Sequence, residues 1–310
     1  MTERKEPSYR RLDTEFISRG ECCAAWLYLP EGVIRPPVVV MAHGLGGDRR
    51  FRLDAFARRF AERGLACFVF DYRGFWESAG EPRNLISPRR HLEDWQAALD
   101  HVKSLDSIDP GKIGLWGTSF SGGHVLVTAA RRGDVRAIVM QVPFVDGLSS
   151  GLNYPLSYIL RAFLHGLGDL LAMVFTLGKA RHRVLYAGGP EEFALLNKPD
   201  CLPGIKNLIP EELDWEELNY RCPASSFITL PLYRPVRYAA GVSCPALVIY
   251  SESDSLIPAE GVRKTAGRMR DARLEPLPPG VGHFDPYHGE EFERMSGREA
   301  DFLCRVLQGP

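Results

Sequence analysis

The chain has 310 residues, of which 45% are hydrophobic and 25% are charged, and its formal net charge at pH 7 is −1. This is the composition of an ordinary globular protein, and the length suffices for one large core with an insertion. Because positive and negative charges nearly balance, the chain lacks the net positive charge typical of proteins that bind nucleic acid or an anionic membrane. We therefore predict no nucleic-acid partner.

Short apolar segments alternate with amphipathic segments along most of the chain. Several of them, such as 38–41 and 246–250, are continuously apolar, as expected for strands buried on both faces of a parallel sheet. Strands that alternate with helices indicate an α/β fold, with a mostly parallel eight-stranded sheet flanked by helices. The predicted strands are 12–17, 22–29, 37–42, 66–70, 112–117, 136–141, 246–250 and 273–277, and the predicted helices are 51–63, 88–104, 121–132, 259–270 and 290–307.

The alternation breaks between residues 143 and 242, where apolar helical runs are mixed with prolines and turns and no strand pattern stands out. An insertion of about a hundred residues is too long to be a loop. We therefore expect a core made of 1–143 and 242–310, with 144–241 inserted as a mainly helical cap, or lid, over the carboxyl ends of the strands.

One apolar stretch, 156–177, has to be compared with a membrane span. Arg161, His165 and Asp169 interrupt it, and its unbroken apolar runs are much shorter than the roughly 20 residues that a bilayer requires. The stretch favours a soluble helix, so we predict no membrane span. The polar N-terminus has no signal-peptide pattern, and the seven cysteines are scattered without a Cys-x-x-Cys pair. These features predict a cytoplasmic protein with reduced thiols and no metal site.

A serine follows the strand predicted at 112–117, at the point where the next helix begins. In the run Gly117-Thr118-Ser119-Phe120-Ser121, small residues stand two positions before and two positions after Ser119. This spacing is typical of a nucleophile elbow, the tight strand-to-helix turn that exposes a serine hydroxyl. Ser121 is a rival, because it also has small residues two positions away on each side. We prefer Ser119, since Ser121 should already lie within the first turn of the helix.

A serine nucleophile requires a base and an acid that orients the base. His283 lies in a glycine-rich loop after the last predicted strand, and Asp254 follows the strand at 246–250. We predict His283 as the base and Asp254 as its partner. His288 is the alternative base and Glu252 is the alternative acid.

A second glycine-rich loop, His43-Gly44-Leu45-Gly46-Gly47, follows the strand predicted at 37–42. Glycines at such a position let backbone N–H groups approach a ligand closely. We predict that the N–H groups of Leu45 and Phe120 form an oxyanion hole. His43 itself is expected to hold the loop by hydrogen bonds.

Together these motifs resemble those of the α/β-hydrolase family, and the resemblance covers about residues 20–143 and 241–305. The order serine, aspartate, histidine along the chain is the order that this fold uses. Within the family, the elbow looks most like that of bacterial serine esterases near the S15-peptidase-like and dienelactone-hydrolase-like branches. Ser121 and Ser251 depart from the pattern, since each stands where glycine is common. The segments that carry the resemblance are the loop at 43–47, Asp71-Tyr72-Arg73-Gly74, the elbow, Asp254 with Ile257-Pro258, and Gly282-His283-Phe284.

The resemblance implies an α/β-hydrolase fold and a serine hydrolase that needs neither a metal nor an organic cofactor. The expected substrate is a small carboxylic ester, cleaved through an acyl-enzyme on Ser119. Apolar cap residues are expected to line the substrate pocket, and we single out Tyr154, Phe163 and Phe175.

Other functions remain open. The same triad would serve a peptidase, a thioesterase or a hydrolase of carbon–carbon bonds, and the fold also occurs in ligand-binding proteins without catalysis. The oligomeric state is open as well, with a homodimer as one candidate. A peptidase would need cap carboxylates to hold a substrate's amino terminus, and those available are Glu191, Glu192, Glu211, Glu212, Glu216 and Glu217.

Overall fold

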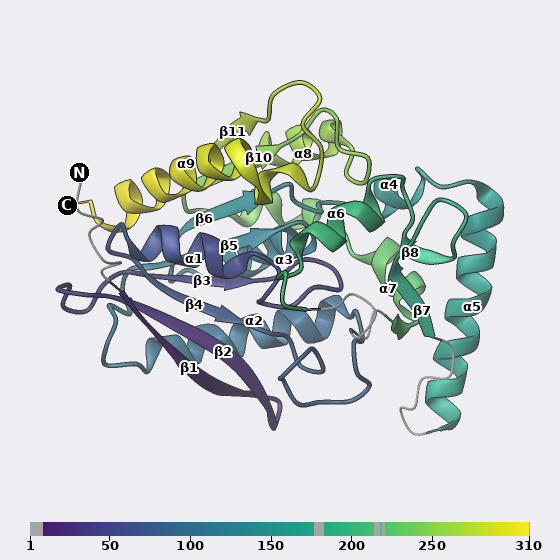
Figure 1. The fold of residues 1–310 in the computed structure, drawn as a ribbon, viewed down its shortest axis with the longest axis horizontal. Helices are drawn as coiled ribbons and strands as arrows, with labels where there is room; N and C mark the ends of the chain where they lie inside the picture. The colour runs from purple at the N-terminus through teal and green to yellow at the C-terminus, as the bar shows by residue number, and fades with distance from the viewer. Residues whose placement is uncertain (1–8, 177–182, 214–217, 219–220, 310) are drawn as a thin grey trace.

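The centre of the fold is an eight-stranded sheet with the order β1-β2-β4-β3-β5-β6-β10-β11 (Figure 1). A computed structural model describes residues 9–176, 183–213, 218 and 221–309. The first two strands are antiparallel to their neighbours, and all other pairs are parallel. All eight predicted strands are present, as β1 Tyr9–Ser18, β2 Glu21–Pro30, β3 Val38–Ala42, β4 Ala66–Phe70, β5 Ile113–Thr118, β6 Val135–Gln141, β10 Ala246–Tyr250 and β11 Ala272–Pro276.

Helices cover both faces of this sheet. On one face α1 (Leu53–Ala61) packs with α9 (Gly289–Leu307), and on the other α2 (Pro88–Lys103) packs with α3 (Phe120–Arg131). The shorter α8 (Ala259–Ala266) lies against β10 and β11. Every residue of β3, β4, β5 and β10 is buried, because these strands are covered on both sides. The predicted fold class is confirmed.

The segment between β6 and β10 contains more than helices. It has the helices α4 (Gly147–Gly151), α5 (Leu156–Phe175), α6 (Cys201–Leu208) and α7 (Ser226–Leu232), followed by a 3₁₀ turn at Pro235–Gly241. It also has a small separate sheet of β7 (Arg183–Ala187), β8 (Ala194–Leu196) and β9 (Arg221–Pro223), in the order β8-β7-β9.

These three strands of the inserted segment were not expected from the sequence, in which no strand pattern stands out there. They are three to five residues long, which is too short for an alternating pattern to stand out from the surrounding turns. The predicted extent of the cap, 144–241, stays a prediction. Glu216 and Glu217, considered above for a peptidase, lie outside the described residues, as does the segment 1–8.

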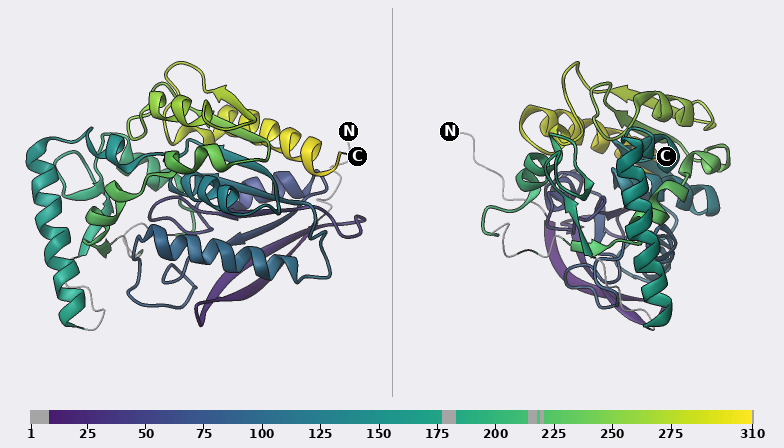
Figure 2. Two further views of the ribbon diagram at one scale, coloured as in Figure 1. Left: turned by 180° about the vertical axis from the view of Figure 1, so that it is seen from behind. Right: turned by 90° about the vertical axis from the view of Figure 1, so that its right-hand side faces the viewer.

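The inserted segment lies at one end of the large sheet, and α5 forms its outer edge in Figure 1 and in the left-hand view of Figure 2. Three of its side chains, Leu196 of β8 and Ile205 and Leu208 of α6, border the same cavity as Ser119. Since Ser119 directly follows β5, this contact puts α6 and β8 over the carboxyl end of the parallel strands.

Candidate active site

Ser119 lies on a sharp turn between β5 and α3. Its backbone has φ 53° and ψ −120°, a left-handed conformation that is rare for a residue with a side chain. The turn is so tight that a Cβ added to Gly117 would lie 2.5 Å from the carbonyl oxygen of Ser121 and 2.6 Å from Val125. Only glycine fits at that position, so local sterics explain the pattern seen in the sequence.

Ser121, the rival nucleophile, is fully buried in the core behind the turn. Its Oγ accepts a hydrogen bond from the Tyr72 hydroxyl at 3.2 Å, and the Tyr72 oxygen in turn accepts one from Trp95 Nε1 at 3.1 Å. Ser119 borders a cavity, whereas Ser121 is not among the residues that line it. The structure therefore makes Ser119, and not Ser121, available to a ligand.

Ser119, His283 and Asp254 form a continuous hydrogen-bonded chain. His283 Nε2 lies 3.0 Å from Ser119 Oγ, and His283 Nδ1 lies 2.7 Å from Asp254 Oδ2. Both the histidine and the aspartate side chains are 3% exposed. An N–H on Nδ1 that donates to Asp254 leaves Nε2 free to accept the hydroxyl proton of Ser119.

The carboxylate of Asp254 is held in place by its own loop. Its Oδ1 accepts the N–H groups of Leu256 and Ile257, both at 2.8 Å, which leaves Oδ2 for His283. The alternative acid, Glu252, points elsewhere and pairs with Arg263 at the surface. His288, the alternative base, lies at the start of α9, where burial and the charge of Arg52 lower its pKa.

The loop after β3 runs alongside the serine. A Cβ added to Gly44 would lie 3.1 Å from Ser119 Cβ and 3.3 Å from the carbonyl oxygen of Thr118. Leu45 borders the same cavity as Ser119, and Phe120, as the first residue of α3, has an N–H without an intrahelical acceptor. These are the two residues predicted for the oxyanion hole, and their binding of an oxyanion stays a prediction.

His43 at the start of this loop is fully buried, and burial lowers its pKa to about 4. The ring is therefore neutral near pH 7, and its Nδ1 lies 2.9 Å from the carbonyl oxygen of Gly44. An N–H on Nδ1 can donate to that oxygen, which holds the loop against Ser119.

The cavity beside Ser119 is small and apolar, with a volume of about 30 Å³. Its walls come from the loop after β3, from the start of α1, from the inserted segment and from the loop that carries His283. The apolar side chains that line it are Leu45, Phe51, Leu53, Leu196, Ile205, Leu208, Phe284 and Tyr287.

Comparison with known proteins agrees with this fold. The profile of the Alpha/beta hydrolase family matches residues 39–295. The chain belongs to this family. It is 38% identical over 296 residues to the quorum-quenching protein AidA of Acinetobacter baumannii, a match that covers 96% of this chain and 95% of the relative. It is 26% identical over 307 residues to the polyketide transferase grgF of a Penicillium species, a match that covers 96% of this chain and 97% of the relative.

Solved structures show the same fold. The complex of DcsB with its substrate analogue superposes with a TM-score of 0.82 at 22% identity, over 97% of this hydrolase and all of that chain. The narrower resemblance to the S15-peptidase-like and dienelactone-hydrolase-like branches stays a prediction.

The three cap residues predicted to line the substrate pocket do not border the cavity at Ser119 in this hydrolase. Tyr154 stacks on Tyr158 in a separate surface depression, and the ammonium of Lys198 lies 4.6 Å above the Tyr154 ring. Phe163 and Phe175 are 51% and 82% exposed on the outer side of α5. Apolarity alone suggested them, because the sequence does not show which helix lies over the serine.

Two residues that the sequence analysis missed, Ile205 and Leu208, reach the cavity from α6. Their spacing of three residues puts them on one helical face, and that was the only signal available in the sequence. It was too weak to separate α6 from the longer and more apolar α5.

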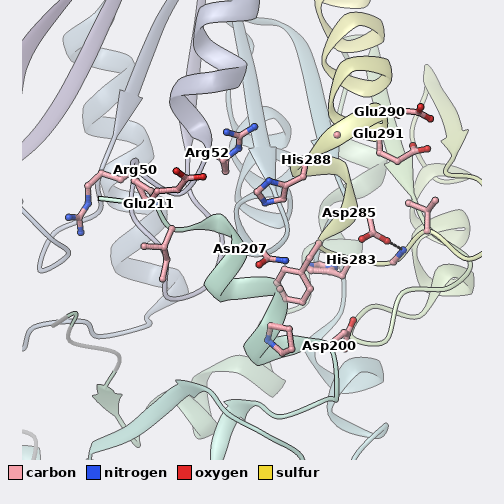
Figure 3. Close-up of a pocket in the computed structure, with 18 of the residues that line it drawn as sticks. Arg50, Arg52, Asp200, Asn207, Glu211, His283, Asp285, His288, Glu290 and Glu291 are labelled. Atoms are coloured by element: carbon pink, nitrogen blue, oxygen red, sulfur yellow. Dashed lines mark hydrogen bonds between the residues drawn. The ribbon is translucent and has the colours of Figure 1, made fainter. Parts of the chain in front are cut away.

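A larger and more polar pocket of about 1350 Å³ meets the site at His283 (Figure 3). Arg50, which is bound to Asp48, and Arg52, which donates to the carbonyl oxygen of Tyr287, line one side. Asp285 lies next to His283 and accepts the N–H of Gly282 at 2.6 Å. Glu211 and Glu212, two of the carboxylates considered for a peptidase, also line this pocket.

Within the described residues, no cluster of His, Cys, Asp and Glu side chains could hold a metal ion.

Proposed function

We propose that this α/β hydrolase is a serine carboxylesterase that cleaves esters through an acyl-enzyme on Ser119. The observation that supports this most is the hydrogen-bonded chain from Ser119 Oγ to His283 Nε2, at 3.0 Å, and from His283 Nδ1 to Asp254, at 2.7 Å. A buried carboxylate, an imidazole and a half-buried serine that borders a cavity at an elbow form the constellation that acyl transfer requires.

In the proposed reaction His283 takes the proton of Ser119 Oγ as that oxygen attacks the ester carbonyl carbon. The N–H groups of Leu45 and Phe120 would donate to the oxyanion of the tetrahedral intermediate. His283 then gives its proton to the leaving alcohol, and Asp254 stabilises the imidazolium throughout. A water molecule, deprotonated by the same histidine, releases the acid and restores Ser119. These steps need no metal and no organic cofactor.

The acyl part of the substrate is proposed to enter beside Ser119 against the apolar side chains under α6, which would have to move apart because the cavity of about 30 Å³ has room for about one water molecule. The polar pocket beside His283 suits the leaving group or the incoming water. The relative named as a quorum-quenching protein makes cyclic esters worth testing, and the one named as a polyketide transferase makes an acyl acceptor other than water worth testing.

We also propose a cytoplasmic location. None of the seven cysteines, all of which lie in the described residues, is part of a disulfide, as expected in a reducing compartment.

A fluorophosphonate probe tests the nucleophile. The wild type and Ser121→Ala should be labelled, and Ser119→Ala should not. Ser121 is the matched control, because it lies two residues away but is buried against Tyr72. Labelling that persists in Ser119→Ala would refute the assignment.

A substrate panel then tests the bond. Esters, lactones, thioesters and amides with the same acyl group should be compared, each with and without an added alcohol as acceptor. We expect the highest kcat/KM for the oxygen esters and loss of turnover in Ser119→Ala. Faster cleavage of thioesters or amides would replace the esterase proposal by a thioesterase or a peptidase. Probe labelling without turnover of any substrate would contradict the proposed esterase.

A further inference from the structure

Among the described residues, helix α5 packs on the rest of the molecule with one side and the flank next to it, where Tyr158 and His165 contact Phe193. Its three buried residues, Ala162, Gly166 and Asp169, share that side, which packs on α7 and the turn before it. A Cβ added to Gly166 would lie 2.8 Å from Ile228, and Asp169 Oδ2 accepts the N–H of Ser225 at 2.9 Å. Close packing of small residues and a buried carboxylate therefore fix the orientation of α5.

The outer side of the same helix is a continuous apolar stripe. Six of its residues follow one another at spacings of four, three, four, three and four, and three more lie beside them. Their exposed fractions range from 37% for Leu167 to 82% for Phe175. Figures 1 and 2 show α5 at the edge of the molecule. The stripe consists of Leu156, Leu160, Phe163, Leu167, Leu170 and Val174, with Leu164, Leu171 and Phe175 alongside.

We propose that this stripe is the contact surface of a homodimer, in which α5 packs against α5 of a second copy. The alternating spacing of four and three is the heptad pattern by which two helices bury a common apolar seam. A stripe of this kind is complementary to itself, so a two-fold axis across the helix satisfies both copies.

The size of the stripe fits the same partner. Exposed apolar patches of several hundred Å² are uncommon on monomers and mark interaction sites. If all nine side chains are covered, the accessible surface that each copy buries is similar to the roughly 800 Å² that each partner buries in a standard interface. A second copy of this chain supplies a matching apolar helix.

A lipid surface is the other partner that a long apolar helix can have. The 20 residues of α5 include a window with a mean hydropathy of 1.4, which by length and composition would suit a membrane span. Insertion would separate Asp169 from Ser225 and leave its carboxylate in hydrocarbon, which is costly. Because Lys179 and Arg181 follow the helix in the sequence, the experiment must still distinguish lipid from protein.

The mass of the protein in solution tests the proposal. Light scattering coupled to size exclusion should give twice the chain mass of 34.7 kDa for the wild type. The double variant Leu160→Glu/Leu167→Glu, which puts two carboxylates into the seam, should run at 34.7 kDa. Ile34→Glu is the matched control, since Ile34 is 92% exposed on the loop between β2 and β3, and this variant should stay dimeric.

The double variant should keep its fold and its labelling by the fluorophosphonate probe, because the two leucines are exposed and are not among the residues that line the cavity. A wild type that is monomeric at about 100 μM would overturn the proposal. A double variant that is still dimeric would overturn it too, because the dimer would then use another surface.

Flotation with phosphatidylcholine–phosphatidylglycerol vesicles separates the lipid alternative. We expect the dimeric wild type to remain unbound. Flotation of the wild type that the double variant abolishes would assign the stripe to a membrane surface and overturn the dimer.

Discussion

Gly204 of α6 lies directly against the ring of Phe284, the residue that follows His283. A Cβ added to Gly204 would come within 2.3 Å of ring atoms Cγ and Cδ2 and within 2.9 Å of Phe284 Cβ. This contact joins the inserted segment to the loop that carries the proposed base, so that a shift of one must move the other.

Gly204→Ala should therefore lower kcat/KM for a small ester, since the added methyl group forces either α6 or the His283 loop to move. We expect a loss of about tenfold to a hundredfold, because misplacement of about 1 Å at a reacting group has effects of this size. Gly297→Ala in α9 is the control, as its Cβ would meet nothing within 4 Å. That variant should keep full activity and gain up to about 1 kcal/mol of stability from helix propensity. Equal activity of the two variants would show that the contact with Phe284 is not critical.

Asp254→Asn should lower kcat by about a thousandfold to ten-thousandfold with little change in the fold. An amide that donates to His283 Nδ1 would favour the tautomer with the proton on Nε2, which cannot accept from Ser119. The control is Glu252→Gln, two residues away, which removes only the surface pair with Arg263. Single-turnover measurements on both variants check this, and similar losses in the two would contradict the assignment of Asp254.

Ile205→Ala should widen the cavity at Ser119 and shift the acyl preference toward bulkier groups. The ratio of kcat/KM for a longer to a shorter acyl ester should rise by tenfold or more, since each methylene in such a pocket is worth about 1–3 kcal/mol. Ile34→Ala, on an exposed loop, should leave the ratio unchanged. A ratio that Ile205→Ala does not alter would put the acyl group elsewhere, for example in the polar pocket of Figure 3.

The free energy of unfolding should fall as pH rises, because Glu299 keeps its proton in the folded state. Glu299 is fully buried in α9, its Oε2 accepts from Trp116 Nε1 at 3.0 Å, and burial raises its pKa to about 8 from an ordinary value of 4.5. Between these two pH values the folded state keeps the proton and the unfolded state has lost it. The free energy of unfolding therefore falls as pH rises from about 4.5 to about 8, by an amount on the order of a few kcal/mol.

Urea unfolding of Glu299→Gln at pH 5.5 and pH 8.5 checks this. The amide does not titrate, so the variant should gain stability relative to the wild type as pH rises. Glu290→Gln, exposed at the start of the same helix, should follow the wild type at both pH values. If the free energies of unfolding of Glu299→Gln and wild type differ by the same amount at both pH values, the raised pKa of Glu299 is refuted.

Much of the core could be predicted because its signals are local. The continuously apolar strands and the amphipathic helices between them identify a parallel sheet, since each strand must be covered on both faces. The turn at Ser119 is visible in the chain itself, because the steric requirement at Gly117 acts between neighbouring residues.

The strands of the inserted segment, and the side chains with which it reaches Ser119, could not be predicted from the sequence. Its strands are short, and the side chains that reach Ser119 come from α6, while those of the more apolar α5 face outward. Which face a helix turns inward depends on its partners. Here Gly166 and Asp169 pack on α7 and leave the leucines outside.

The sequence by itself determined the sheet, the elbow and the three residues that could form a triad. Local sterics act between neighbouring residues, and the order of the motifs can be seen along the chain. Only the tertiary structure decided that His283 Nε2 lies 3.0 Å from Ser119, that Ser121 is buried behind it, and that α6 closes the cavity. His283 and Ser119 are 164 positions apart in the chain, and the other two features also depend on residues from different segments. They arise from how helices and loops pack over the sheet, which no single segment of the chain specifies.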